Sequence, residues 1–210
     1  SATPDRPVPA AAASQSPDQT SSSPSEPQEF TLDPLPPVVI PEKVQAEWKK
    51  NDAEFKRQLE NRVSMIGALQ NPRVQAILDL ISRPEGGTYD SHNSGAKMTN
   101  FDEHPGFGPP NKQGDSSSAA GRYQMLKRTF DGIKKQIGPL TMSEPSQDLA
   151  AAWLLKELGA LKALESGNLD TAISAAAVPK GWAALPGGVQ QRIDMGQAKA
   201  LYEEFLRQRM

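Results

Sequence analysis

The sequence has no cysteine, and its net charge is small. Because none of its 210 residues is a cysteine, disulfide bonds and cysteine-bound zinc are both excluded, and the redox compartment stays undetermined. The most apolar stretch near the start, residues 30–40, is too short and too rich in proline to span a membrane. The chain opens with neither a methionine nor a charged-then-apolar secretion signal, which indicates a fragment or a processed product.

The first 41 residues differ in composition from the rest of the chain. They hold ten of the nineteen prolines, set among Ser, Ala and Gln. Such a segment buries too little apolar surface to offset the entropy of ordering it, so we expect residues 1–41 to form a disordered or extended tether. Its apolar end, residues 30–40, is expected to fasten the tether onto a folded surface. The segment carries a net charge of −4 within the whole-chain −2, which leaves about +2 for the remainder. That remainder is too weakly basic to predict nucleic-acid binding, although it would not repel an anionic polymer such as a cell wall.

Residues 42–71 read as one long amphipathic helix. Apolar residues recur at steps of three, four and seven, and the face between them is charged; the apolar positions are Val44, Trp48, Phe55, Leu59, Val63, Ile66 and Leu69. We expect this apolar face to pack on the domain or on a partner. Residues 72–210 are long enough to form one domain with a sizeable core.

The stretch from Ile81 to Tyr89, ISRPEGGTY, is the first candidate for chemistry. The apolar spacing upstream predicts a helix from about Pro72 to Arg83, with Glu85 just past its end. Gly86 and the glycine after it leave space beside the carboxylate, and partial burial would raise its pKa toward a value useful for proton donation. Glutamate followed by glycine is also common at ordinary helix ends, so both interpretations stay open on this fragment alone.

Residues 90–120 show no regular periodicity, which inside a compact domain indicates a functional region with short strands or a lobe facing a cleft. Both histidines lie here, His92 and His104, beside Asp90, Asp102 and Glu103. Two histidines and two carboxylates would satisfy a hydrolytic zinc, but the spacing matches no helix-borne metal motif, so we predict neither a metal nor another cofactor.

The second half of the chain is helical again. A small-residue turn near Gly121 is expected to feed a helix that begins with Tyr123 and Gln124 and ends near Gly138. Another helix follows, with Ser143 as its cap and Pro145 in its first turn, and its apolar stripe is Leu149, Trp153, Leu154, Leu158 and Leu161. Asn168 is expected to cap a short alanine-rich helix, and a terminal helix carries Leu201 and Phe205. These patterns predict a mainly α (α+β) domain.

Several runs in this half resemble the bacteriophage lambda endolysin family. They are SAAGRYQML from Ser118, SQD from Ser146, KELGAL from Lys156 and WAALPG from Trp182, in the same order as the Glu85-Gly86 turn and the FDEHP segment at Phe101. The resemblance covers about Val74 to Phe205. It implies a lysozyme-like fold with a small irregular or β lobe.

The resemblance implies that the protein is a lytic transglycosylase acting on peptidoglycan, with Glu85 as its catalytic residue. Such an enzyme needs one carboxyl group, which protonates the leaving oxygen and then accepts the proton of the muramoyl 6-hydroxyl. Hydrolysis normally needs a second carboxylate, for which Asp90, Asp102 and Glu103 are candidates. A hydrolytic lysozyme and a non-catalytic peptidoglycan-binding module therefore remain alternatives.

The resemblance also suggests that Gln124 contacts sugar near the scissile bond, and Tyr89, Tyr123 and Trp182 are further candidate substrate contacts. Core packing explains Tyr123 and Trp182 equally well. Arg122 either forms a structural ion pair or meets the peptide carboxylates of the wall.

Two features depart from the family pattern. Proline at position 84 disfavours helical geometry in the residue before it, so the helix is expected to end early. Residues 1–71 have no counterpart in the small endolysin, which favours attachment to a larger phage or secretion assembly. We therefore expect action in the bacterial periplasm or cell wall, with delivery in a virion or by a secretion apparatus.

Overall fold

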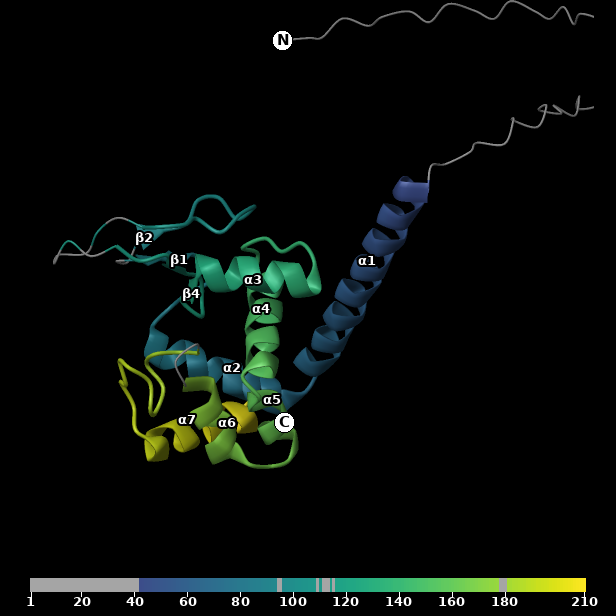
Figure 1. Ribbon diagram of the computed structural model, residues 1–210. Helices are drawn as coiled ribbons and strands as arrows, with labels where there is room; N and C mark the ends of the chain where they lie inside the picture. The colour runs from purple at the N-terminus through teal and green to yellow at the C-terminus, as the bar shows by residue number, and fades with distance from the viewer. Residues whose placement is uncertain (1–41, 94–95, 109, 111–113, 115, 178–180) are drawn as a thin grey trace, which may run out of the picture. The chain divides into compact units, whose positions relative to one another are not determined.

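The computed structural model describes residues 42–93, 96–108, 110, 114, 116–177 and 181–210 (Figure 1). The predicted tether and its apolar end lie outside the described residues. The described helices are α1 (Glu42–Leu69), α2 (Pro72–Glu85), α3 (Lys127–Ile137), α4 (Glu144–Glu157), α5 (Ala160–Glu165), α6 (Leu169–Ala177) and α7 (Met195–Arg207). The described strands are β1 (Ser91–His92), β2 (Ala96–Lys97), β3 (Ala119–Ala120) and β4 (Met125–Leu126). These elements confirm the mainly α fold with a small β lobe.

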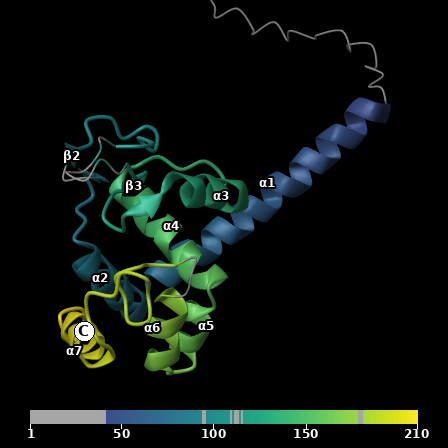
Figure 2. The same cartoon turned by 60° about the vertical axis from the view of Figure 1, so that its left-hand side comes forward.

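Among the side chains that the structure describes, helix α1 packs on the domain with only the end of the expected apolar stripe, at Leu69. Four apolar side chains of the predicted stripe are exposed: Phe55, Leu59, Val63 and Ile66. Near the end of the helix, Met65 is buried in the core, and Ala68 and Leu69 pack against it. Polar side chains add hydrogen bonds to carbonyl oxygens at and just beyond the end of α3; the donors are Arg57, Gln58, Asn61 and Arg62. The last carbonyls of a helix have no partner within it, so they attract such donors. The first half of α1 extends away from the other helices (Figures 1 and 2). No helix in the described part of the chain is both long and apolar enough to cross a membrane.

Helix α2 carries Glu85 in its last turn, so the prediction that the helix ends before Pro84 was wrong. Asn71 caps its start by accepting a hydrogen bond from the Arg73 amide at 2.9 Å, and Pro72 occupies the first turn, where no amide hydrogen is needed. Pro84 cannot donate to the carbonyl one turn earlier, but the next turn still closes because the Gly86 amide donates to the Ser82 carbonyl at 3.0 Å. The helix then stops because Gly86 is left-handed, with φ 71°.

The four short strands form one antiparallel sheet in the order β2-β1-β3-β4. The turn between β3 and β4 contains Tyr123 and Gln124, which we had expected to start a helix. Gly121 and Gln124 both have positive φ, 74° and 47°, and such a backbone cannot begin a right-handed helix. Helix α3 therefore begins at Lys127.

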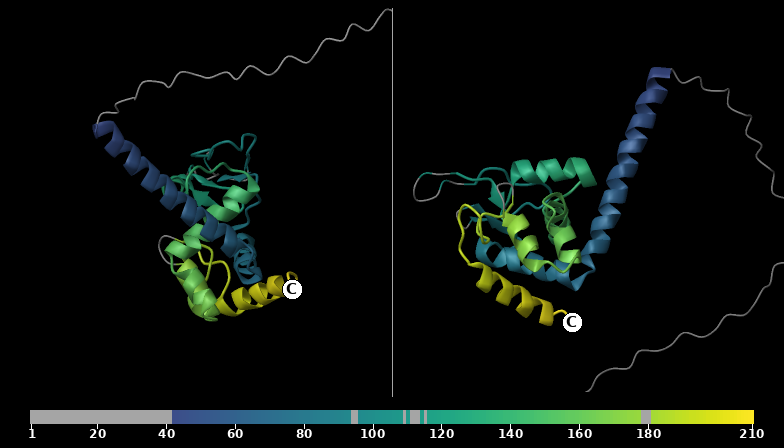
Figure 3. Two further views of the ribbon diagram at one scale, coloured as in Figure 1. Left: turned by 90° about the vertical axis from the view of Figure 1, so that its right-hand side faces the viewer. Right: turned by 60° about the horizontal axis from the view of Figure 1, so that its bottom comes forward.

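Helix α4 is the centre of the core. Its residues 150–152 and Leu155 are fully buried, and α4 runs between α3 on one side and α5, α6 and α7 on the other (Figures 1 and 3). The predicted single stripe reaching Leu161 is split, because Gly159 is left-handed with φ 79° and separates α4 from α5. The predicted cap of α6 is present, since Asn168 Oδ1 accepts from the Thr171 amide at 3.1 Å.

Candidate active site

The carboxyl group of Glu85 lies beside a cleft of about 560 Å³. One wall of the cleft comes from the β lobe and includes Ser117 and Ala119, and the other comes from the loop between α6 and α7. Because Glu85 is the last residue of α2, the buried helix fixes its backbone while its side chain reaches the cleft.

The loop between α6 and α7 shelters this carboxyl group. The Ala184 amide donates to Glu85 Oε1 at 3.1 Å, although the two residues are 99 positions apart in the sequence. Arg192 Nη1 donates to the Pro84 carbonyl at 3.0 Å and so holds the end of the loop against the end of α2. Sequence reasoning missed both contacts, because no local pattern marks which distant amide meets an acid.

The pKa of Glu85 is raised above its usual value. Burial is the largest cause, since desolvation penalises the charged form; the Ala184 hydrogen bond and the Arg192 charge act in the opposite direction but are weaker. A carboxyl group with a raised pKa stays protonated at a higher pH than a free glutamate. It can therefore donate a proton and later accept one.

The turn between β3 and β4 is held close to the backbone that follows Glu85. A Cβ atom on Gly87 would lie 2.5 Å from the carbonyl oxygens of Gly121 and Arg122, so only glycine allows this approach. The same turn presents Gln124 to the cleft. Gln124 has φ 47°, a conformation that costs a non-glycine residue on the order of 1 kcal/mol and that often occurs at functional sites. Its Nε2 donates to the Gly121 carbonyl at 2.8 Å.

Trp182 also lines the cleft, although most of its ring is in the core. The side chain is 4% exposed, and Nε1 donates to the Tyr123 carbonyl at 2.9 Å. This bond ties the sheltering loop to the turn that carries Gln124. The structure thus brings Glu85, Gln124 and Trp182 together around one cleft.

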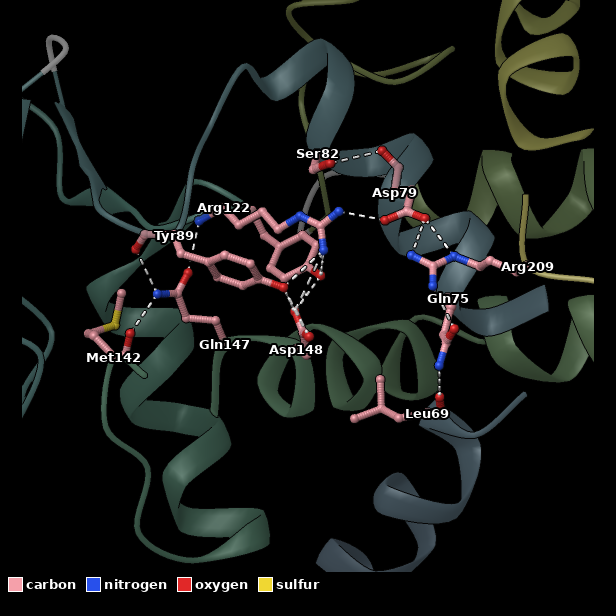
Figure 4. A network of polar contacts seen from close by, with 11 residues as sticks. Leu69, Gln75, Asp79, Ser82, Tyr89, Arg122, Met142, Gln147, Asp148 and Arg209 are labelled. Atoms are coloured by element: carbon pink, nitrogen blue, oxygen red, sulfur yellow. Dashed lines mark hydrogen bonds and ion pairs between the residues drawn. The ribbon is translucent and has the colours of Figure 1, made fainter. Parts of the chain in front are cut away.

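Tyr89 and Tyr123 lie elsewhere, around a separate pocket. Both hydroxyl groups donate to Asp148, and Figure 4 shows the contact of Tyr89. Tyr123 is 2% exposed and packs in the core, which is one of the two roles we had considered for it. Burial and the Asp148 carboxylate raise the pKa of Tyr89 to about 12, so its hydroxyl remains a donor at neutral pH. Neither hydroxyl group is available to a sugar in the Glu85 cleft.

Arg122 forms a structural ion pair, which decides between its two predicted roles. Its Nη2 pairs with Asp79 on α2, and its Nη1 donates to the Tyr89 hydroxyl at 3.0 Å (Figure 4). Arg209 pairs with the other oxygen of Asp79. Sequence reasoning missed Asp79, although a lone carboxylate inside the apolar run from Ile77 to Ile81 indicates a buried partner.

Gln147 joins this network to the turn that presents Gln124. Its Oε1 accepts from the Arg122 amide at 2.8 Å, and its Nε2 donates to the carbonyls of Tyr89 and Met142 at 2.8 and 2.6 Å (Figure 4). The start of α4 therefore holds the segment after Glu85 and the turn before Gln124 in one arrangement.

The other acidic residues that we considered do not line the cleft. Asp90 forms an exposed ion pair with Lys97, and Asp102 and Glu103 are exposed. Among the residues that the structure describes, Glu85 is the only carboxylate in the wall of this cleft.

The two histidines make backbone contacts within the β lobe. His104 is buried, with Nε2 2.9 Å from the Met125 carbonyl oxygen, and His92 Nε2 lies 3.2 Å from that of Gly106. Burial lowers the pKa of His104, because desolvation penalises its charged form. No group of three potential metal ligands occurs within the described ranges.

Comparison with known proteins gives concordant matches. The sequence model of the family described as Endolysin matches residues 75–208. The endolysin of Escherichia phage lambda is 33% identical over 127 residues, which are 56% of this chain and 79% of that protein. The endolysin of Escherichia phage P2 is 38% identical over 101 residues, 45% of this chain and 60% of that protein.

Solved structures agree with the sequence matches. The lysozyme of bacteriophage lambda, in complex with a chitohexasaccharide, superposes with a TM-score of 0.56 at 31% identity and covers 65% of this chain and 94% of that one. A second structure of the lambda lysozyme gives a TM-score of 0.55 at 30% identity with the same coverage, 65% and 94%.

The fold and the matches together define the class: a lysozyme-like, peptidoglycan-degrading glycosidase. The match to the family covers more than half of the sequence. The chain belongs to the endolysin family.

Proposed function

We propose that the protein is a lytic transglycosylase that cleaves the bond from N-acetylmuramic acid to N-acetylglucosamine. The observation that supports this reaction is the single sheltered carboxyl group of Glu85, with no second carboxylate among the described residues that line its cleft. Hydrolysis by the usual routes needs a pair of carboxyl groups, about 5 to 9.5 Å apart. Intramolecular attack by a sugar hydroxyl needs only one.

In this proposal Glu85 acts first as acid and then as base. It donates its proton to the glycosidic oxygen while the bond from that oxygen to the muramoyl anomeric carbon breaks. The carboxylate then accepts the proton of the 6-hydroxyl group as its oxygen bonds to the anomeric carbon. The product is a 1,6-anhydro sugar, no water is consumed, and Glu85 is protonated again.

The remaining site residues are assigned by position. Gln124 and Trp182 line the cleft and would contact the glycan, and the chitohexasaccharide bound by the lambda lysozyme supports a saccharide as the ligand. Tyr89 and Tyr123 are committed to Asp148, so we assign them to holding the turn rather than to the sugar.

Digestion of purified sacculi tests the reaction. Mass spectrometry of the released muropeptides should show anhydro ends, lighter by one water than hydrolytic products. Glu85→Gln should reduce release by about 10²- to 10⁴-fold, because the amide keeps the shape but cannot exchange a proton. Asp90→Asn, Asp102→Asn and Glu103→Gln serve as controls and should retain activity. Reducing ends would show a hydrolytic lysozyme instead, and binding without release would show a peptidoglycan-binding module.

We also propose that residues 72–210 are the catalytic domain and that residues 1–71 connect it to a larger phage or secretion assembly that delivers it to the wall. The exposed apolar side chains of α1 and the composition of residues 1–41 support this division. Limited proteolysis should trim the chain rapidly to a stable core that starts near residue 40. Resistance from Ser1 onward would refute the disordered tether.

A further inference from the structure

A second hollow, of about 680 Å³, adjoins the Glu85 cleft. The two hollows share four lining residues, Gln124, Leu126, Gly181 and Trp182, so a ligand held at Glu85 can continue into the second hollow. One side of the second hollow is the exposed face of α3, and Glu157 at the end of α4 lies on another side.

Two opposite charges face this hollow without neutralising each other. Arg128 on α3 and Glu157 form no ion pair or side-chain hydrogen bond with any residue that the structure describes. The neighbouring cation behaves differently, since Lys127 pairs with Asp131 at 2.6 Å. An unpaired guanidinium in a groove is suited to binding a carboxylate through two parallel hydrogen bonds, and an unpaired carboxylate is suited to an ammonium group.

The same hollow has open space beside α3, because position 132 is a glycine. Nothing lies within 4 Å of the place where its Cβ would be. Gly132 is one turn after Arg128 and lines the same hollow. Glycine inside a helix costs about 1 kcal/mol relative to alanine, so here the chain keeps space above the helix at some cost in stability.

The chemistry of peptidoglycan supplies a ligand with matching charges. Each muramoyl ring carries, on the carbon two positions from its anomeric carbon, a lactyl group that leads to a short peptide with free carboxylates and, where it contains a diamino acid, a free amino group. A ring whose anomeric carbon is held at Glu85 must therefore place its peptide within about one sugar width of the acid.

We propose that the second hollow binds the stem peptide of the muramoyl residue being cleaved, with Arg128 on a peptide carboxylate and Glu157 facing the amino group. This assignment rests on the proposed function of the Glu85 cleft. It makes Arg128 a residue that determines specificity for peptide-bearing over bare glycan.

Paired substrates test the assignment. Glycan strands carrying their peptides are compared with the same strands stripped of peptide by an amidase, and total cleavage products are measured whatever their ends. Arg128→Ala should lower kcat/KM by about 3- to 10-fold on peptide-bearing strands, mainly through KM, and by less than about 2-fold on stripped strands. Lys135→Ala removes an exposed cation from the same helix outside the hollow and should change neither value.

Gly132→Leu gives a second variant that is expected to fold, because leucine favours the helix and its side chain enters open space. It should reduce cleavage of peptide-bearing strands selectively. Titration of each substrate into Glu85→Gln protein should show tighter binding of peptide-bearing strands, a preference that Arg128→Ala removes.

An amidase leaves the lactyl carboxylate on the stripped strands, so equal losses on both substrates would assign the hollow to the muramoyl sugar with its lactyl group and would overturn the peptide assignment alone. If Arg128→Ala behaved like Lys135→Ala, the peptide assignment would also be overturned. Absence of any product from wild-type protein on both substrates would overturn the proposed function, and the peptide assignment with it.

Discussion

Replacing Asp79 with asparagine tests how strongly the network in Figure 4 stabilises the protein. The Asp79 carboxylate is 10% exposed and pairs with two arginines, Arg122 (22% exposed) and Arg209 (33% exposed). Asparagine keeps the shape of the side chain but removes its charge and accepts through only one oxygen. Arg122 then stays largely buried, with Asp148 as its nearest acid at 4.0 Å.

The expected loss can be worked from these exposures. Removing one partner of a buried ion pair typically costs about 3–5 kcal/mol, whereas a surface pair contributes about 0–1 kcal/mol. The pair with Arg122 belongs to the first class, at its low end because Asp148 and the Tyr89 hydroxyl remain. The pair with Arg209 is closer to the second class. We therefore expect Asp79→Asn to lower the free energy of unfolding by about 3 kcal/mol, equivalent to about 6–12 °C in Tm for a domain of this size.

Urea unfolding followed by far-ultraviolet circular dichroism measures this loss. The midpoint should fall with the slope unchanged, because the surface exposed on unfolding stays the same. Arg122→Met should cost about as much as Asp79→Asn, and Arg209→Gln about 1 kcal/mol or less. The Asp79→Asn, Arg122→Met double variant should cost less than the sum of its two single variants, because they remove the same interaction.

Two results would refute this reasoning. A loss below about 1 kcal/mol for Asp79→Asn would show that the pair contributes no more than a surface contact. Equal losses for Arg209→Gln and Arg122→Met would show that burial does not set the cost.

Three further predictions concern the site and the packing of α1. Burial raises the folded-state pKa of Glu85, so the wild-type protein loses stability as the pH rises through that value. Glu85→Gln should therefore be more stable than wild type at about pH 7. This difference in the free energy of unfolding should disappear below the ordinary glutamate pKa of 4.5. Urea titrations across this range measure the difference, and a difference that grew toward acid pH would contradict the raised pKa. Gly87→Ala places a Cβ atom 2.5 Å from two carbonyl oxygens of the β3–β4 turn, so we expect a loss of about 1–3 kcal/mol with reduced wall digestion, and unchanged stability and digestion would show that the turn yields freely. Met65→Ala should lower the free energy of unfolding by about 2–5 kcal/mol because the side chain is 2% exposed, whereas Phe55→Ala should change it by no more than about 0.5 kcal/mol because Phe55 is 66% exposed. Thermal unfolding measures both losses, and a larger loss for Phe55→Ala would mean that α1 packs through its other face.

The sequence identified most helices because their apolar periodicity is a local property. It also located the α6 cap at Asn168 and the first-turn proline of α4, Pro145, which act within a few residues of themselves. It failed at boundaries. The apolar spacing from Leu149 to Leu161 continues unchanged across Gly159, so the sequence does not show that the helix is interrupted. The left-handed backbone of Gly159 shows the break between α4 and α5. The helix expected at Tyr123 is a hairpin turn, because left-handed backbone angles are not visible in residue order.

The residues of the candidate site were also only partly predictable from the sequence. Glu85 and Gln124 could be selected from their glycine-rich surroundings and from the family resemblance, and they line one cleft. Tyr89 and Tyr123 were equally plausible in sequence, yet both serve Asp148, which lies 59 and 25 residues away from them. Their role depends on the tertiary contact of their hydroxyl groups with Asp148.

The sequence alone determined which residues can carry the chemistry: a glutamate beside glycines, an amide-bearing turn, and helices able to hold both. Only the tertiary structure decided which acid is sheltered, because the amide and the arginine that surround Glu85 come from a loop about a hundred residues further along the chain. Desolvation and electrostatic interactions depend on distance in space. The folded chain places groups side by side that are far apart in the sequence, so these effects cannot be read from residue order.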